Sequence, residues 1–422
     1  METLLAIGIA MAAGLLVSRF VKLLKLPAVT GYLIAGILIG PYCLGNLGIE
    51  GIGFVTTESV KANTIICDTA LGFIAFAIGN EFRLSQIKQI GKQAAIVGIF
   101  QAVAATVAVD AVLIGMHFAM PDKLPISAAI TLGAIATATA PAATLMVVRQ
   151  YKAKGKLTDI LLPIVAIDDA VGLVVFAVSF GIAKSLESGE ISAVSVIAEP
   201  LIEVAVSLLL GTLMGFLFSA AEKFFKSNSK RLTLSITFVI LTVALSMIKF
   251  DVFGVKVGFS SLLVCMMLGT VFCNVCDFSP EIMEKTDKWT APLFLLFFVL
   301  SGAELEFDIF GDFTVIIIGV VYIIVRAAGK YFGAGTSAKL AKCEPKIVKY
   351  LGITLLPQAG VALGMSVTAE TLGGGIGTLI RNITLFAVLI YELVGPVLTK
   401  YALTKSGDIT PKATAATDTD DE

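Results

Sequence analysis

Charged residues are scarce in this sequence. Only 15% of its 422 residues are Asp, Glu, Lys or Arg, whereas 57% are hydrophobic. Soluble domains carry about 25% charged residues, so the composition excludes a water-soluble globule of this size. The formal net charge is −1, which provides no electrostatic basis for binding nucleic acid.

Histidine and cysteine are too few and too scattered to form a conventional metal site. His117 is the only histidine, and Cys273 and Cys276 form the only Cys-x-x-Cys pair among six cysteines. A structural zinc site usually needs four such ligands close together. We therefore interpret these cysteines as packing residues.

Long apolar runs recur along the whole chain. A run of about 20 residues allows a helix to cross a hydrocarbon core of roughly 30 Å. The runs do not alternate polar and apolar residues, which excludes a transmembrane β-barrel. The first run lacks a basic segment before it and a cleavage site, so we interpret it as a retained helix rather than a signal peptide. The sequence predicts an all-α polytopic membrane protein with about 13 transmembrane helices, at 2–21, 28–48, 62–82, 93–117, 124–148, 158–183, 195–221, 232–249, 256–275, 289–303, 312–336, 347–369 and 377–402.

The basic residues indicate how these spans are oriented. If the ends alternate between two sides, twenty-three of the 31 Lys and Arg residues fall on one side and six on the other. Cytoplasmic loops accumulate Lys and Arg, so we expect the N-terminus outside the cell and the C-terminus in the cytoplasm. Residues 403–422 carry too little apolar surface to fold, and we expect them to form a disordered cytoplasmic tail.

Two similar segments indicate an internal repeat. A Gly-x-Glu element ends the third span at 79–81, and another ends the tenth span at 302–304. Three spans follow each element, and a proline interrupts the middle one, Pro141 in the first repeat and Pro357 in the second. The third and tenth spans run in opposite directions, so the repeats are inverted. Paired broken helices in inverted repeats indicate a midplane binding site of a secondary transporter.

Two adjacent acids lie inside the sixth span. Asp168 and Asp169 are about ten residues from its cytoplasmic end, which places them near the midplane at about 1.5 Å per residue. An ionisable residue at that depth costs at least about 2.5–3.5 kcal/mol, so the pair is a functional candidate. Neighbouring helix positions differ by about 100°, so one carboxylate can face a cavity while the other faces a partner helix.

The candidate partners are two cationic residues inside the eleventh span. Arg326 and Lys330 lie one helical turn apart on the same face. Small residues around Lys330 would let a neighbouring helix approach closely. Arg326 could equally be an interhelical clamp, and Lys330 lies near enough to the cytoplasmic end to snorkel. Glu392, at the repeat position corresponding to the aspartate pair, is expected to stabilise the dipole of a broken helix.

With these residues identified, the chain resembles the monovalent cation/proton antiporter superfamily. It fits the branch that contains the bacterial electrogenic sodium/proton antiporters, which carry the Asp-Asp motif, and the potassium-efflux antiporters. The resemblance covers residues 1–402 and is carried by Leu26–Pro41, the Gly-x-Glu elements, the Asp-Asp pair and the Glu-Leu-Val-Gly-Pro segment at 392–396. It implies that Asp169 is the essential ion and proton carrier and that Asp168 pairs with Lys330.

The resemblance also implies where the ion is bound. The unwound stretches Thr137–Pro141 and Pro357–Gly360 would cross beside the aspartates, with Thr137, Thr139 and Gln358 in the crossing. Thr137 and Thr139 would join the two carboxylates as Na⁺ ligands. We expect no cofactor other than the transported Na⁺ and H⁺.

Members of this superfamily are homodimers in which a core domain moves against a dimerising scaffold. We therefore expect a homodimer in the lipid bilayer of the cell membrane. The implied parts are 1–84 and 185–311 for the scaffold, the latter including a linker helix, and 85–184 and 312–402 for the core.

The expected function is secondary active exchange of Na⁺ or Li⁺ for H⁺ by alternating access, in an electrogenic cycle. A K⁺/H⁺ antiporter is the first alternative, although potassium-efflux members typically carry Gln-Asp in place of Asp-Asp. A sodium-coupled organic anion symporter would more often offer polar ligands to its substrate. A channel lacks support because no filter such as TVGYG appears. No enzyme is expected, because an intramembrane aspartyl protease needs two carboxylates facing each other from different helices.

Overall fold

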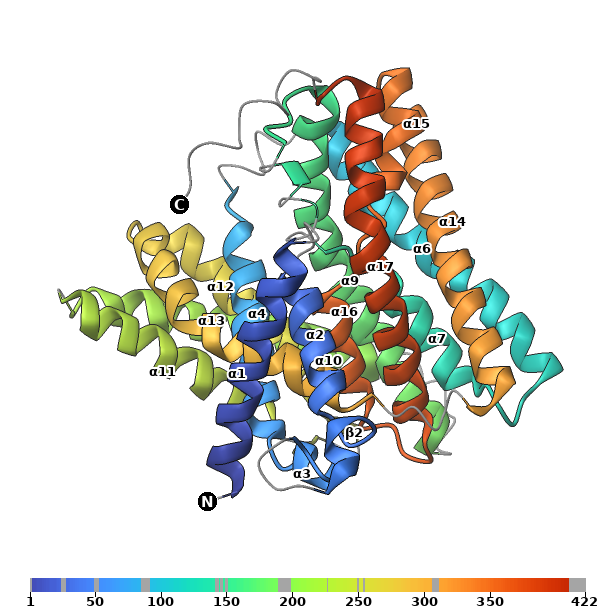
Figure 1. Ribbon diagram of the computed structural model, residues 1–422. Coiled ribbons are helices and arrows are strands. Elements are labelled where there is room, and N and C mark those ends of the chain that lie inside the picture. Colours follow the sequence, from blue (N-terminus) through green and yellow to red (C-terminus); the bar gives the residue numbers. More distant parts are fainter. Residues whose placement is uncertain are drawn as a thin grey trace.

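The computed structural model is helical almost throughout (Figure 1). It describes residues 2–23, 28–48, 53–84, 92–140, 144, 147–148, 151–188, 199–225, 227–248, 250–252, 255–305 and 311–409. The elements are α1 (Glu2–Leu23), α2 (Ala28–Ile39), η1 (Leu44–Leu47), α3 (Thr57–Lys61), α4 (Thr64–Glu81), α6 (Lys92–Ala119), α7 (Ile126–Ile135), α9 (Lys156–Ser188), α10 (Glu199–Glu222), α11 (Asn228–Ser246), β1 (Phe250–Val252), β2 (Val255–Val257), α12 (Ser261–Val275), α13 (Ser279–Ala303), α14 (Phe313–Leu340), α15 (Pro345–Thr354), α16 (Gly360–Ala369) and α17 (Ile376–Ser406).

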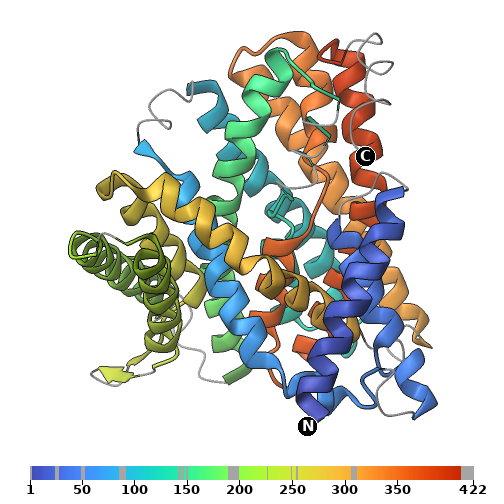
Figure 2. The same ribbon diagram turned by 60° about the vertical axis from the view of Figure 1, so that its left-hand side comes forward.

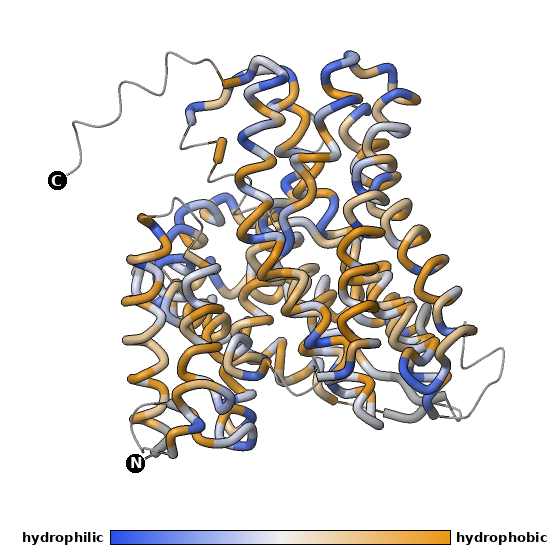
Figure 3. The backbone as a smooth tube through the Cα atoms, turned by 45° about the vertical axis from the view of Figure 1, so that its right-hand side comes forward, coloured by the Kyte–Doolittle hydropathy of each residue, from blue (hydrophilic) through white to orange (hydrophobic). Residues whose placement is uncertain are grey.

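Each of the thirteen expected spans coincides with one helix or with a broken helix, which confirms the predicted fold class. Among the described residues, eight helices are long and apolar enough to cross a membrane, and four shorter apolar helices accompany them. Figure 3 shows hydrophobic residues along most of the length of these helices.

A short β-hairpin was not expected. β1 and β2 form an antiparallel hairpin that pairs Phe250 with Val257, so α12 begins at Ser261 rather than at residue 256. Hydropathy alone does not separate so short an apolar hairpin from the start of an apolar helix.

One group of helices packs around α13 and α12. Both α1 and α2 pack on α13, and α12 packs against α4 and α10 (Figure 2). Two glycines allow α2 and α13 to touch, because a side chain at Gly36 or Gly302 would collide with the backbone of the opposite helix. Small residues at such contacts let membrane helices approach closely. The Gly-x-Glu element of the tenth span is therefore also a packing element.

A second group of helices surrounds α9. There α6 lies against α7, α9 and α14, and α17 packs on α14, α15 and α16 (Figure 1). Gly329 and Gly333 bring α14 against Ala105 and Ala104 of α6. The small residues around Lys330 therefore allow the close helix approach that the sequence predicted.

Two helices are broken at the centre of the molecule. α7 ends at Ile135, and residues 136–140 are not helical. Likewise α15 ends at Thr354, and α16 begins only at Gly360. The backbone N–H of Ala140 donates a 2.8 Å hydrogen bond to the carbonyl oxygen of Pro357, so the two breaks meet. Pro141 lies outside the described residues.

The last helix extends further than its composition indicates. α17 runs to Ser406 and ends at Gly407, whose φ of +95° provides a left-handed cap. Leu403 is fully buried, and the Asp408 carboxylate accepts hydrogen bonds from the backbone N–H and the hydroxyl of Thr158 at the start of α9. The expected tail boundary at 403 is therefore too early. Residues 410–422 lie outside the described residues.

Candidate ion-binding site

The two aspartates lie deep within α9, a helix of 33 residues. The exposed fraction is 0% for Asp168 and 1% for Asp169. They are adjacent on a helix, so they point in directions about 100° apart. Asp169 shares a helix face with Leu173 and Phe176, which belong to the main hydrophobic cluster. The two carboxylates therefore leave α9 in different directions, and that of Asp168 enters the polar cluster described below.

Asp168 is held by groups from three other segments. Its Oδ2 accepts from Lys330 Nζ of α14 at 2.8 Å and from the Thr139 hydroxyl in the first break. Its Oδ1 accepts from Gln101 Nε2 of α6. The carboxylate is thus compensated on both of its oxygens.

Lys330 is fully buried and points into the protein, so it does not snorkel. Besides Asp168, its Nζ donates to the carbonyl oxygen of Thr137 and to Oγ1 of Thr139, the latter at 3.0 Å. Thr137 follows the C-terminal end of α7, where helix carbonyls carry partial negative charge. The ammonium group therefore lies between a carboxylate and the negative end of a broken helix.

Arg326 clamps the two breaks to each other. Its Nε and Nη2 donate to the carbonyl oxygens of Ala136 and Ala138 at 3.1 and 2.6 Å, and its Nη1 donates to that of Leu356 at 2.8 Å. The guanidinium also stacks 4.4 Å from the ring centroid of Tyr391.

From the sequence, Lys330 and Arg326 are both candidate salt-bridge partners or proton carriers. Their contacts in the structure differ. Lys330 forms the ion pair with Asp168, and the contacts of Arg326 are those of the interhelical clamp. The five N–H donors of Arg326 suit the several backbone carbonyls that a broken helix exposes.

The second break is fixed from the opposite side. Gln358 donates through Nε2 to the carbonyl oxygen of Ile135 at 3.0 Å and to the Tyr322 hydroxyl at 3.2 Å. Pro357 packs against Gly395, where an added Cβ would lie 2.9 Å from the proline ring. Gly360 then starts α16. Together these contacts hold both unwound stretches beside Asp168.

Glu392 occupies a different place from the one expected. It is buried on α17, and its carboxylate accepts a 3.2 Å hydrogen bond from the hydroxyl of Thr30. Thr30 lies in the first turn of α2, where unpaired backbone N–H groups favour an acid. The helix that Glu392 faces is therefore α2 rather than a broken helix, because the repeat symmetry fixes its position along α17 but not its neighbours.

Two features of the buried polar network were missed in the sequence. Gln101 is uncharged, and the only signal is a single amide in the apolar middle of α6. Arg381 was one of the six basic residues counted on the less basic side of the membrane. It is 2% exposed and forms ion pairs with Glu304 of the α13 C-terminus and, at 2.8 Å, with Glu370 after α16. The Gly-x-Glu element that contains Glu304 was the available signal for this network.

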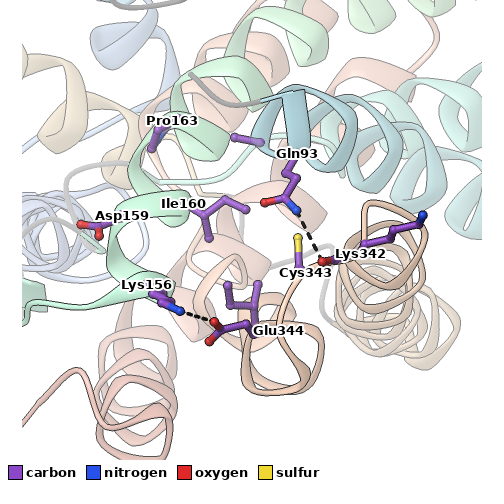
Figure 4. A pocket seen from close by; sticks show the side chains of 10 residues that line it. Gln93, Lys156, Asp159, Ile160, Pro163, Lys342, Cys343 and Glu344 are labelled. Atoms are coloured by element: carbon purple, nitrogen blue, oxygen red, sulfur yellow. Dashed lines mark hydrogen bonds and ion pairs between the residues drawn. The ribbon is translucent and has the colours of Figure 1, made fainter. Parts of the chain in front are cut away.

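An open pocket of about 480 Å³ lies at the predicted cytoplasmic end of α6, α9 and α15. Figure 4 shows the Gln93 amide directed at the backbone of Lys342 and the Lys156 ammonium directed at Glu344. Pro163 lines the pocket one and a half turns before the aspartates, but none of the residues that bind Asp168 does. The pocket is therefore separate from the Asp168 cluster.

The groups near the aspartates that could bind a cation are oxygen atoms. Within the described ranges, no group of three or more His, Cys, Asp or Glu side chains gathers to hold a metal ion. Carboxylates, threonine hydroxyls and the carbonyls freed by a broken helix are instead ligands that suit hard cations. Thr139 bonds Asp168, and Thr137 bonds Lys330 beside it. That these two threonines and the two aspartates bind Na⁺ together stays a prediction.

Comparisons with known proteins agree with this architecture. A family model described as "Sodium/hydrogen exchanger, transmembrane" matches residues 7–405. The chain is 25% identical to the Na⁺/H⁺ antiporter NhaS4 of Synechocystis sp. over 364 residues, which cover 82% of this chain and 83% of NhaS4. It is 23% identical to the Na⁺/H⁺ antiporter NhaS5 of the same organism over 385 residues, covering 89% of this chain and 51% of NhaS5. The solved structure of the sodium proton antiporter MjNhaP1 from Methanocaldococcus jannaschii at pH 8 superposes with a TM-score of 0.73 at 17% identity, covering 97% and 99% of the two chains.

Proposed function

This chain belongs to the sodium/hydrogen exchanger family, and we propose that it exchanges Na⁺ or Li⁺ for H⁺ electrogenically at Asp168 and Asp169. It is a multi-pass membrane transporter and not an enzyme. The proposal rests chiefly on the fully buried ion pair between Asp168 and Lys330 beside the meeting point of the two breaks. Folding does not require such a pair, because apolar residues of similar volume are often equally stable in its place. A second acid next to it points to a transported charge.

Asp169 is the proposed carrier. A carboxylate in a confined site binds a proton or a dehydrated cation but not both, so the two ligands compete. Neutral oxygens from Thr137, Thr139 and the broken helices would complete the coordination of the cation. Competition at one carboxylate yields exchange, because each ligand must leave before the other binds.

Lys330 is proposed to make the cycle electrogenic. When a cation binds at Asp169, Asp168 turns toward the cation and releases Lys330, which then loses its proton. The cation-loaded site thus carries one positive charge fewer than the site with protons on both Asp169 and Lys330. Two protons would exchange for one cation, and one net charge would cross the membrane in each cycle.

Alternating access follows from the cost of moving charge through the bilayer. The core, residues 85–184 and 312–402, would reorient only when Asp169 is neutralised by a proton or a cation, because a bare charge at the bilayer centre is expensive. The scaffold, residues 1–84 and 185–311, would stay fixed and form a homodimer. We place the N-terminus outside and the C-terminus in the cytoplasm, in the cell membrane, from the distribution of Lys and Arg.

Flux measurements in proteoliposomes test this proposal. With an imposed pH gradient, Na⁺ and Li⁺ should collapse the gradient and K⁺ should be much less effective. A larger response to K⁺ would support the alternative K⁺/H⁺ antiporter instead. A response to none of the three cations would contradict the proposed function.

Replacing Asp169 identifies the carrier. Asp169→Asn should abolish exchange in a folded protein, because it removes the titratable charge at nearly constant shape. Glu344→Gln is the matched control, since it also neutralises one acid, but in an exposed ion pair outside the site. Sodium-dependent proton flux at the wild-type rate in Asp169→Asn would exclude Asp169 as the carrier.

A further inference from the structure

Gln101 is the neutral side chain that reaches the aspartate cluster from α6. It is fully buried, and its Nε2 donates to Oδ1 of Asp168 and, at 3.1 Å, to the carbonyl oxygen of Gly98. Within the described part of the chain, no other hydrogen bond reaches Oδ1, whereas Oδ2 accepts from Lys330 and Thr139. The donor to Oδ1 therefore comes from α6, whereas the donors to Oδ2 come from α14 and the first break.

The contacts determine which way the amide of Gln101 is turned. Both neighbours, the Asp168 carboxylate and the Gly98 carbonyl, are acceptors, so the NH₂ group must face them. Among the described residues, Oε1 has no hydrogen-bond partner. A buried amide oxygen without a donor costs free energy, so the side chain is not placed there by its own hydrogen-bonding needs.

Close helix packing leaves Gln101 little freedom to move away. One turn earlier, a Cβ at Gly98 would lie 3.0 Å from Ile167 of α9. On the other side, a Cβ at Gly333 of α14 would lie 3.3 Å from the Cα of Gln101. The glutamine thus lies where α6 meets both the helix that carries Asp168 and the helix that carries Lys330.

We propose that Gln101 is a positioning residue that holds the Asp168 carboxylate while Lys330 is released from it. This inference rests on the proposed function, in which cation binding separates Asp168 from Lys330. At that moment Asp168 loses its only charged donor within the described residues. Gln101 is neutral and bonds the opposite oxygen, so its contact survives the release. After Lys330 leaves, this bond meets a carboxylate whose charge is less compensated, so it is stronger in the cation-bound state than in the state in which Lys330 is paired.

The test is Gln101→Met, which keeps the length of the side chain and removes its donor. We expect the KM for Na⁺ to rise by up to about tenfold, because a hydrogen bond to a charged group contributes at least that factor in full and only its gain in strength after Lys330 leaves enters the affinity. The rate at saturating Na⁺ should change much less. Gln101→Asn, which is one methylene shorter and cannot reach Asp168 without movement of α6, should show the same split if the methionine variant does not fold.

Two comparisons separate positioning from packing. Gln93→Leu on the same helix also removes an amide that donates to backbone carbonyls, at Ala341 and Lys342, and should leave the KM unchanged. In a Lys330→Gln background there is no lysine to release, so adding Gln101→Met should raise the KM little further. Equal effects of Gln101→Met in both backgrounds would overturn the inference.

A second readout does not depend on transport. Sodium raises the melting temperature of a protein that binds it in the folded state, and the increment falls when the affinity falls. Gln101→Met should lose most of this sodium-dependent increment, whereas a packing defect would lower the melting temperature equally with and without Na⁺. A wild type that neither transports nor binds these cations refutes the proposed function. A functional wild type with an unchanged KM in Gln101→Met refutes only the role of Gln101.

Discussion

Replacing Lys330 by glutamine removes the charged partner of Asp168 and leaves a side chain that can still donate a hydrogen bond. In the structure both members of the pair are fully buried, with 2.8 Å between Nζ and Oδ2. Arg326, one turn away, donates to backbone carbonyls and does not replace the missing charge. The variant therefore tests a charge rather than a shape.

The expected loss of stability follows from the geometry of the pair. At 2.8 Å and an effective dielectric constant of about 20, the attraction is about 6 kcal/mol. Removing one partner of a buried pair typically costs about 3–5 kcal/mol, and the glutamine amide offsets part of it. We expect Lys330→Gln to melt roughly 5–10 °C below the wild type.

The expected change in transport concerns the membrane potential. A cycle that moves one net charge gains about 2.3 kcal/mol per 100 mV, which corresponds to about a 50-fold change in the cation gradient at equilibrium. If Lys330 carries one of two protons, Lys330→Gln should still exchange cations for protons but lose this dependence. The assay is proton flux in proteoliposomes with and without a potential set by valinomycin and K⁺.

Lys156→Gln is the matched control for Lys330→Gln. Lys156 also pairs with an acid, Glu344, but the two side chains are 73% and 51% exposed. Exposed ion pairs contribute about 0–1 kcal/mol, so the control should melt and transport like the wild type. A Lys330→Gln variant that keeps both the melting temperature and the potential dependence of the wild type would remove Lys330 from the mechanism.

Three further predictions concern other ion pairs and the clamp between the broken helices. Arg326→Lys keeps the charge but loses the fork that binds three carbonyls, so we expect lower thermal stability and slower exchange, measured by melting curves and flux. Arg381→Gln leaves the buried Glu304 without its cation and should destabilise the protein by about 3–5 kcal/mol, measured by melting curves, with recovery when Glu304 is also changed to Gln. Lys123 and a backbone N–H of α14 hold the pKa of Asp312 below its usual value, so the stability that Asp312 contributes should persist down to about pH 4 and vanish as the pH falls further. Melting curves of wild type and Asp312→Asn between pH 7 and 3 should therefore converge at the acid end.

The spans and the main ion pair were predictable because hydropathy and formal charge are large signals in a membrane. An acid or a base inside an apolar run costs several kcal/mol unless it has a partner, so the few such residues constrain one another. Asp168 had only Arg326 and Lys330 as intramembrane candidates, and the structure pairs it with Lys330. The sequence could not decide between them, because the acceptors of Arg326 are backbone carbonyls. Every residue has such a carbonyl, so only the fold shows which of them lie near Arg326.

Neutral polar residues and helix ends were harder to predict. An amide side chain inside a helix can donate to a backbone carbonyl of the same helix, as Gln101 does to Gly98. Its presence in an apolar run therefore does not predict a partner on another helix. Arg381 near the start of an apolar span looks like an interfacial cation, and only its contact with Glu304 shows that it is buried. The end of α17 depends on Asp408 reaching α9, which is a tertiary contact.

The two cations of α14 show how similar residues acquire different chemistry from their acceptors. Arg326 binds carbonyls whose partial charges are fixed by the breaks, so nothing in the proposed cycle changes its surroundings while the crossing persists. Lys330 shares a carboxylate with Thr139, and a carboxylate can turn toward a new cation. A lysine that loses such a partner in a buried place favours its neutral form, whereas an arginine would stay charged. The broken helices therefore serve two purposes in the proposed mechanism: they anchor the permanent charge and they leave the exchangeable charge dependent on Asp168.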